Sequence, residues 1–389
     1  MLRENMTRKH RIQETEVTQK HSKECQDDVM SKKCWRLFHI FHRANLKLSL
    51  FLCIVAIAIG EVGCFFWAFF TWRIPLPSED IDSLNLLLVA DSQIQGFWNE
   101  PPGITGYISR LDADWYLWKV FRLLMTAFSP DAVIHLGDLF DEGNIATDEE
   151  FLLYKARHDR IFTVPEGVSK IQVAGDNDVG GEGVDRMTQK LISRFSHFFG
   201  FVNEVIELKS FQIVKVNSLI LQRSKPRLEE WTVYNETLAF IKELPLRLDK
   251  DKSTILIEHS ALNMINKEIV SKLIDVVQPR YAFSGHSHKS ASFQHPMGSV
   301  TVTEYVVPTC SYRMGTNKMG AAIAVLGVNG SIDYSILSLP TRYTYFNIYL
   351  YVLVYCMVLR LPFLIRIIAK IYYKLTARKY GIYKIATFL

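Results

Sequence analysis

Short apolar runs alternate with helical segments along the middle of the chain, from Leu84 onward. Residues 115–128 and 149–162 have the periodicity of amphipathic helices, and they separate runs with the length and composition of buried strands. The first five runs are LNLLLVA, DAVIHLG, VSKIQVAG, STILIEH and PRYAFSG. This rhythm predicts an α/β fold with crossover helices. After His288, the runs SVTVTEYVV, AAIAVLGV and SIDYSILSL predict a closing set of antiparallel strands.

Two longer apolar runs flank this region. Residues 48–72 are long enough to cross a bilayer and lie too far from Met1 to be a cleaved signal peptide. Glu61 within them is costly in lipid, so we expect it to be protonated, paired, or turned toward a neighbouring helix. The second run, residues 345–369, is interrupted by Arg360 and Pro362. Either its helix continues to about Ile368, or it ends near Leu359 and an interfacial helix follows.

The charge of the chain is concentrated at its ends. Residues 1–47 and 370–389 together carry +10, so the remaining residues carry −5 of the formal total of +5. This division argues against a nucleic-acid groove and for tails that lie on an anionic membrane face. The positive-inside rule then predicts that both tails are cytosolic, the first one disordered, and that a domain over residues 84–340 lies in the lumen. We expect that domain to lack disulfides because Cys310 is its only cysteine, and its sequons at Asn235 and Asn329 suit a secretory compartment.

Polar side chains of one chemical class follow each of the first five runs. In order, they are Asp91, then Asp138 and Asp141, then Asp176, then His259, and finally His286 and His288. In α/β sheets, ligands bind at the carboxyl ends of the strands, so we expect these groups to meet at one edge. Carboxylates and imidazoles together suit Mn, Fe or Zn, and the oxygen ligands favour Mn²⁺. A pair of such ions can activate water toward a phosphate ester.

The order of these motifs resembles that of the calcineurin-like metallophosphoesterase superfamily, whose motifs run D-x-H, G-D-x-x-D, G-N-H-D/E, H and G-H-x-H. The corresponding segments here are ADSQIQG, GDLFDEG, GDNDVGG, EHSA and SGHSH. The resemblance implies a four-layer αββα sandwich with mixed sheets, flanked here by two transmembrane helices. More narrowly, GDLFDEG, QPRYAFSGHSH and PTCSYRMG between two apolar runs are similar to the membrane-bound phosphoesterases of GPI-anchor remodelling. Such an enzyme removes an ethanolamine-phosphate branch from the GPI glycan, and this lets GPI-anchored proteins leave the endoplasmic reticulum toward the Golgi.

The same resemblance implies a role for each residue of the site. One ion would be held by Asp91, Asp138 and His288, with Gln93 in place of a histidine. Asp138 would bridge to a second ion, which would be held by Asp176, His259 and His286. Asp141 would orient a ligand or the bridging water, and Arg313 would bind a phosphate oxygen.

Three positions depart from the superfamily pattern. Gln93 offers a neutral amide oxygen, whereas Asp176 adds a negative charge where asparagine is usual. Asn177 stands in place of the histidine that donates a proton to the leaving group, and asparagine cannot give up a proton at neutral pH. General acid catalysis typically contributes ~10²–10⁴ in rate. The alternative to a phosphodiesterase is therefore an impaired, metal-binding cargo adaptor, and a nucleotide or phospholipid head-group hydrolase is a third reading.

Other conspicuous residues have structural interpretations. We expect His135 to lie in the core, since strand alternation turns it away from the site. The amphipathic surroundings of His158 and His197 predict surface positions. Trp115 and Trp118 fit the buried stripe of a helix.

Overall fold

The computed structural model describes residues 33, 38, 40–76, 82–222, 225–298 and 300–380. The chain divides into two compact units, residues 1–62 with 343–389, and residues 63–342. Most of the predicted N-terminal tail, and residues 381–389 of the C-terminal one, lie outside the described residues.

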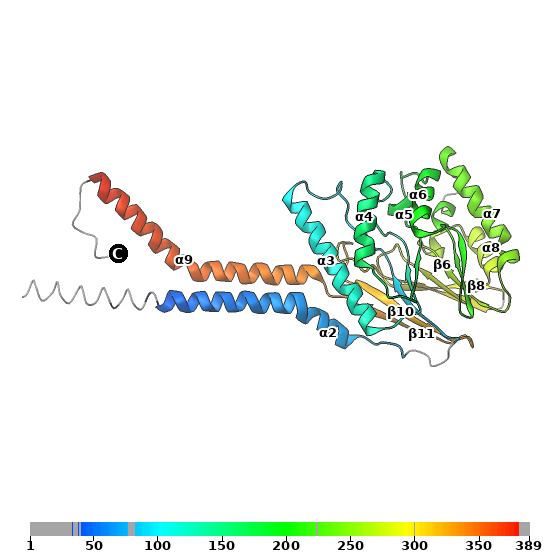
Figure 1. The fold of residues 1–389 in the computed structure, drawn as a ribbon, viewed down its shortest axis with the longest axis horizontal. Helices are drawn as coiled ribbons and strands as arrows, with labels where there is room; N and C mark the ends of the chain where they lie inside the picture. The colour runs from blue at the N-terminus through cyan, green and yellow to red at the C-terminus, as the bar shows by residue number, and fades with distance from the viewer. Residues whose placement is uncertain are drawn as a thin grey trace, which may run out of the picture. The chain divides into compact units, whose positions relative to one another are not determined.

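The first unit contains two long apolar helices. The first apolar helix covers Ile40–Thr71, includes a π-helical turn, η1 (Ile59–Gly63), and passes into the second unit as α2 (Cys64–Thr71). The second, α9 (Arg342–Tyr380), runs on through Pro362 and well beyond Ile368, and Figure 1 shows a bend within it. By length and composition, Ile40–Thr71 and Arg342–Tyr373 could each cross a membrane. Glu61 accepts a hydrogen bond from the Tyr349 hydroxyl at 3.0 Å, so the acidic group in the first helix has a partner on the second.

The second unit contains two mixed sheets. The first has the order β11-β10-β1-β2-β3, in which β1 (Leu84–Val89), β2 (Ala132–His135) and β3 (Ser169–Gln172) are parallel. The strands β10 (Gly320–Leu326) and β11 (Ile332–Ser338) complete it as an antiparallel pair, and β10 pairs antiparallel with β1. The antiparallel arrangement predicted for the runs AAIAVLGV and SIDYSILSL is therefore confirmed.

The second sheet has the order β4-β5-β6-β7-β9-β8. Its parallel centre consists of β5 (Phe211–Lys215), β6 (Ser253–Ile257), β7 (Tyr281–Ser284) and β9 (Val300–Val306). The antiparallel edges are β4 (Glu204–Leu208) and β8 (Ala291–Met297). The expectation that β9 joins a purely antiparallel set was wrong. The polar strand β8, which contains Pro296, reverses the chain first, so β9 returns parallel to β7.

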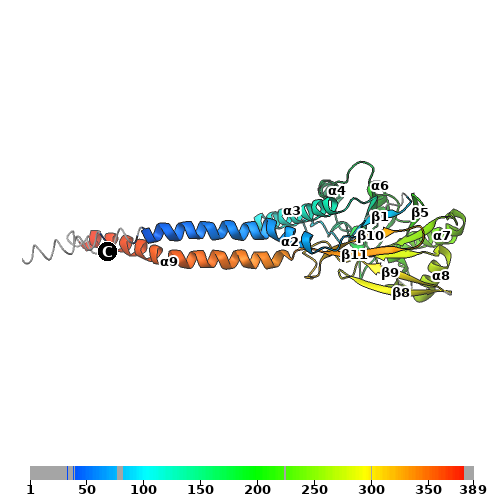
Figure 2. The same cartoon turned by 90° about the horizontal axis from the view of Figure 1, so that it is seen from below.

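The two sheets share one apolar core. Alternate residues of β1, β2, β6 and β7 point into it, including Leu86, Ile134, Ile255 and Phe283. On the other face of β2, His135 contacts Phe121 of α3 (Ile104–Ala127) and His158 of α4 (Asp148–Ile161). Figure 2 shows the sheets nearly edge-on, with β10 and β11 above β8 and β9. The α/β class and the mixed sheets are therefore confirmed.

The described part of the second unit contains four further α-helices and three 3₁₀ turns. They are α5 (Asp176–Val179), α6 (Gln189–Phe199), α7 (Trp231–Arg247) and α8 (Lys267–Val277), with 3₁₀ turns η2 (Ser218–Leu221), η3 (Leu228–Glu230) and η4 (Leu262–Met264). The helices α7 and α8 pack against each other, and α8 also contacts β8.

Two predictions of side-chain burial were wrong. His158 is fully buried, because α4 lies between β2 and α6 and the rings of His135 and Phe199 cover it from both sides. Trp115 is 50% exposed, because the buried stripe of α3 runs through its neighbour Tyr116 instead. His135 in the core and His197 at the surface are confirmed.

Candidate functional site

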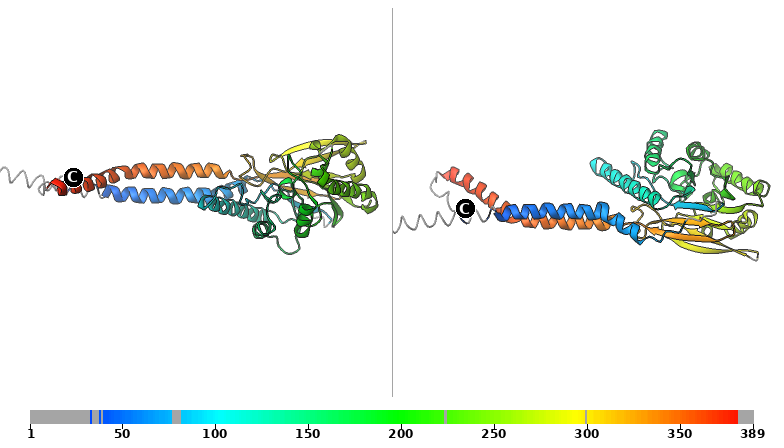
Figure 3. Two further views of the ribbon diagram at one scale, coloured as in Figure 1. Left: turned by 90° about the horizontal axis from the view of Figure 1, so that it is seen from above. Right: turned by 60° about the horizontal axis from the view of Figure 1, so that its bottom comes forward.

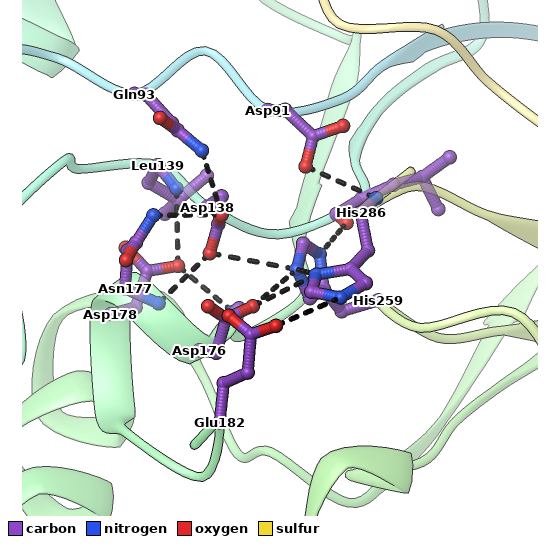
Figure 4. Close-up of polar contacts among 12 residues, drawn as sticks. Asp91, Gln93, Asp138, Leu139, Asp176, Asn177, Asp178, Glu182, His259 and His286 are labelled. Atoms are coloured by element: carbon purple, nitrogen blue, oxygen red, sulfur yellow. Dashed lines mark hydrogen bonds and ion pairs between the residues drawn. The ribbon is translucent and has the colours of Figure 1, made fainter. Parts of the chain in front are cut away.

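Five of the seven predicted strand-end residues converge on one buried site, although they come from two sheets. Asp91 and Asp138 follow β1 and β2, and Asp176 begins α5 directly after β3. His259 and His286 follow β6 and β7 of the second sheet. Figure 4 shows these five side chains pointing toward one another. The site thus lies where the carboxyl ends of both parallel sets meet, rather than at the edge of a single sheet.

Three of these residues form a tight triangle of potential metal ligands. His259 Nε2 and His286 Nδ1 each lie 3.0 Å from Asp176 Oδ1, and the two nitrogens are 3.2 Å apart. A second group consists of Asp91, Asp138 and His259, in which His259 Nε2 is 3.5 Å from Asp138 Oδ1. In each group the ligand atoms lie within 4.8 Å of one another, and His259 is common to both.

A backbone carbonyl on the side away from the ligand groups fixes the orientation of the His259 ring. Its Nδ1 lies 2.7 Å from the carbonyl oxygen of Leu136, which can only accept, so Nδ1 carries the proton. Nε2 is therefore the nitrogen that faces Asp176 and the site, as in metal-bound histidines whose other nitrogen donates to a backbone carbonyl. Gly137 permits this approach, because its φ is +92° and an added Cβ would lie 2.2 Å from His259 Nδ1.

The backbone of the site is strained. Seven non-glycine residues in the described part of the chain have positive φ, and five of them belong to the predicted ligand set. These are Asp91 (48°), Gln93 (41°), Asp138 (51°), His286 (65°) and His288 (58°). Left-handed backbone in such residues costs of the order of 1–3 kcal/mol each and concentrates at functional sites. The fold therefore holds the loops in conformations that they would not adopt alone.

Charges crowd together in this small buried space. Burial raises the pKa of Asp91 to about 7 and that of Asp138 to about 6. Burial also acts to raise the pKa of Asp176, but hydrogen bonds to His259 and His286 outweigh it and hold that pKa well below its usual range. In turn, burial acts to lower the pKa of His259, whereas Asp138 and Asp176 raise it well above normal. Three carboxylates here require positive charge, which imidazolium or a metal cation can supply.

Two of the three unusual residues, Gln93 and Asn177, contact Asp138. Gln93 and Asn177 both donate their side-chain amides to Asp138 Oδ2, at 2.9 and 3.0 Å. Gln93 Nε2 also lies 3.4 Å from His288 Nε2, and His288 stands outside both candidate ligand groups. To bind an ion, Gln93 would have to turn its amide so that the oxygen faces the site. The assignment of Gln93 and His288 to an ion remains a prediction.

Asp141 and Arg313 lie together beside the ligand groups rather than among them. Arg313 donates to Glu100 Oε1 at 2.6 Å, and Asp141 is hydrogen-bonded to Asn99. Burial, followed by the nearby charge of Glu142, raises the pKa of Asp141 to about 6. Phosphate binding by Arg313 and the orientation of a ligand by Asp141 therefore stay predictions.

Sequence reasoning missed a central buried carboxylate, Asp178. Its Oδ2 accepts from the backbone N–H of Leu139 at 3.1 Å and of Gly175 at 2.9 Å, and its Oδ1 from that of Phe140 at 3.0 Å. It thereby joins the two Gly-Asp turns that carry Asp138 and Asp176. The available signal was its place at the end of the GDND segment, where the superfamily motif carries an acidic residue.

Comparison with known proteins identifies the family. The sequence model of the calcineurin-like phosphoesterases matches residues 84–290, which contain both ligand groups. The chain belongs to the calcineurin-like phosphoesterase family. The family comprises metal-dependent phosphoesterases, so the chain is assigned to the metallophosphoesterase class of hydrolases.

Several relatives resemble this phosphoesterase over most of their length. It is 25% identical to the Metallophosphoesterase 1 homolog of Drosophila melanogaster over 71% of this chain and 81% of that one. It is 24% identical to the Metallophosphoesterase 1 homolog of Caenorhabditis elegans over 79% and 88% of the two chains. A solved structure described as a dimetal phosphatase from Danio rerio covers 66% of this chain and 97% of its own, with a TM-score of 0.43 and 11% identity.

The residues of this phosphoesterase fit divalent metal ions. Asp91 Oδ1 accepts from the His286 N–H at 3.1 Å, but its Oδ2 is buried and has no hydrogen-bond partner among the residues that the structure describes. Such an orphaned carboxylate oxygen is costly unless a cation faces it. His259 and His286 also turn nitrogens toward the same Asp176 oxygen. The donor set therefore suits metal ions, which would be held by Asp91, Asp138, Asp176, His259 and His286.

Proposed function

We propose that this protein is a membrane-anchored, two-metal phosphodiesterase that removes an ethanolamine-phosphate branch from the glycan of GPI anchors. The single observation that carries the hydrolytic part is the convergence of Asp91, Asp138, Asp176, His259 and His286 on one buried space. The similarity to proteins named Metallophosphoesterase 1 supports the same part. The substrate rests on the resemblance of the motifs between two apolar runs to phosphoesterases of GPI remodelling.

The residues of the site have different roles in the proposed hydrolysis of a phosphate ester. Ions held by the two ligand groups, for which Mn²⁺ suits the oxygen-rich donors, would supply an activated water and stabilise charge on the phosphate. His259 and His286 each turn one ring nitrogen into the site, where a bound ion would face it, and the Leu136 carbonyl orients His259 through its other nitrogen. We assign Arg313 to a phosphate oxygen, because a guanidinium group matches phosphate oxygens bidentately. The Glu100 carboxylate holds its guanidinium in place.

The Asn177 position favours a second candidate function. Its amide donates to Asp138 Oδ2, and its backbone N–H donates to Asp138 Oδ1, both at 3.0 Å. The side chain is therefore engaged in orienting a carboxylate and cannot protonate a leaving alkoxide. A protein with this site that binds metal and phosphorylated glycan without turnover would act as a cargo adaptor.

The proposed location follows from the two apolar helices. Ile40–Thr71 and Arg342–Tyr373 would cross the membranes of the endoplasmic reticulum and Golgi with both basic tails in the cytosol. The phosphoesterase domain would then face the lumen, where GPI glycolipids and GPI-anchored proteins carry their glycans. The glycans would be presented close to the membrane surface, within reach of an anchored domain.

Hydrolysis by the purified full chain tests the proposal. The chain is incubated with a GPI glycan that bears ethanolamine phosphate, and release of phosphoethanolamine is measured by mass spectrometry. We expect release by the wild type, none by Asp138→Ala, and normal release by Asp185→Ala, which removes an exposed carboxylate from the loop after α5. Binding of metal and glycan without release would instead support the adaptor.

A further inference from the structure

The outer face of α3 carries a continuous apolar stripe. Ile104, Tyr107, Ile108, Leu111 and Trp115 are between 48% and 78% exposed. At the 100° per residue of an α-helix, these positions fall within an arc of about 100°. The opposite side of the helix, which includes Tyr116, Val120 and Leu124, is buried in the domain. We call the five exposed residues the α3 stripe.

The α3 stripe lies beside α2, whose Phe65 packs against the buried side of α3. Phe65 of α2 lies 6.0 Å from Tyr116 of α3, measured between ring centroids. The Lys119 ammonium lies over both Phe65 and Trp115, at 4.9 and 5.0 Å from their ring centroids. On α2 itself, Trp67 is 74% exposed and Phe70 is 78% exposed. Lys119 therefore links α2 to Trp115 of the stripe, and α2 is the last part of the first apolar helix (Figure 1).

The composition of this surface is that of a helix lying at a membrane interface. Tryptophan and tyrosine prefer the headgroup level, and lysine or arginine beside an apolar stripe reaches toward lipid phosphates. Trp118 stacks on Trp115 with ring centroids 5.0 Å apart, and Arg122 lies over Trp118. A water-exposed helix would not be expected to combine so many large apolar side chains on its outer face.

The same surface borders the candidate active site. The segment between Gln95 and α3 carries the exposed side chains of Phe97 and Trp98. Glu142 accepts from the backbone N–H of Trp98 at 2.9 Å, and Glu100 of this segment holds Arg313. The short stretch of chain between β1 and α3, whose backbone can be followed in Figure 3, thus links the helix that carries the stripe to Glu100 and Arg313.

We infer that the α3 stripe lies on the bilayer surface, so that the domain rests on the membrane with its active site beside lipid-borne substrate. The occupant is the lipid surface of the same membrane that the first apolar helix would cross, because α2, the end of that helix, packs against α3 beside the stripe. This inference rests on the proposed membrane anchoring. It adds a second contact that fixes the orientation of the domain. Without this contact, the two apolar helices alone would not determine which side of the domain faces the membrane.

Photo-crosslinking in the full chain tests this contact. p-Benzoylphenylalanine is introduced in place of Ile108, or in place of Leu246, an 89% exposed leucine of α7 that serves as the matched control. A third variant carries it in place of Leu353, within the proposed second span. After irradiation of native membranes, adducts are identified by the mass gained by the labelled peptide. We expect lipid adducts at positions 108 and 353 and none at position 246.

Each other outcome overturns the inference in a distinguishable way. Lipid adducts at position 353 without any at 108 would leave the anchor intact and show that the stripe faces water. Adducts of position 108 to a second copy of the chain, or to another protein, would assign the stripe to a protein interface. If neither 108 nor 353 gives a lipid adduct and alkaline carbonate releases the chain, the proposed anchoring fails together with the contact.

Discussion

Replacing Asp178 with alanine should destabilise the domain and disorganise the metal site at once. The carboxylate is fully buried and accepts three backbone hydrogen bonds, from Leu139, Phe140 and Gly175. Each buried donor left without a partner costs about 1–3 kcal/mol. Water entering the vacated space can satisfy some of them, so we expect a loss of about 3–6 kcal/mol in the free energy of unfolding. For a domain of this size, that corresponds to a Tm lower by roughly 10 °C or more.

Thermal melting followed by tryptophan fluorescence, together with elemental analysis, measures both effects. Asp178→Asn keeps one carbonyl oxygen and should give an intermediate Tm, which separates lost hydrogen bonds from a simple cavity. Asp185→Ala removes an exposed carboxylate from the loop after α5 and should change stability by less than about 0.5 kcal/mol. If Asp178→Ala melted like Asp185→Ala and kept its metal, the two Gly-Asp turns would not depend on this side chain.

Three further predictions follow from the site and its surroundings. Burial lowers the pKa of His158 to about 4, so the folded protein stays neutral there while the unfolded chain gains a proton. As the pH is lowered from about 6.5 to 4, the free energy of unfolding should therefore fall by up to about 1.4 kcal/mol per pH unit. In His158→Phe, the free energy of unfolding should depend on pH less steeply across this range, by the same amount per pH unit. Asn177→His restores a proton donor, so if the wild type is limited by its absence, phosphodiester hydrolysis should rise by ~10²–10⁴; an unchanged rate would refute that role. Gly137→Ala should abolish metal binding, since its Cβ would strike His259, whereas Gly167→Ala has the same kind of positive φ with open space around it and should bind metal normally.

The order of acidic residues and histidines along the chain was sufficient to predict which loops form the site. Each of these residues follows an apolar run, and the run ends are what the two sheets bring together. The sequence alone could not show that the five runs divide between two sheets, because β4, β5 and β8 are short or polar and lack a strong strand pattern. It also could not show which imidazole stands in which ligand group, since that depends on backbone strain at His286 and His288.

Residues that act through backbone contacts were harder to predict than residues that face the site. Asp178 resembles an ordinary turn acid in the sequence, and only the structure shows that it joins two loops. His158 was predicted at the surface because its surroundings in the sequence are amphipathic. Its burial comes from α6, which packs over it from a distant part of the sequence. Trp115 was predicted to be buried on periodicity alone, but the adjacent positions Ala113, Tyr116 and Leu117 face the core instead.

Metal content of the purified full chain tests the central claim most directly. Elemental analysis of the wild type beside His259→Ala, whose side chain belongs to both ligand groups, should give two equivalents of divalent metal per wild-type chain and a large loss of both in the variant. A wild type without bound metal, or a variant with the same metal content as the wild type, would contradict a two-metal centre at this site.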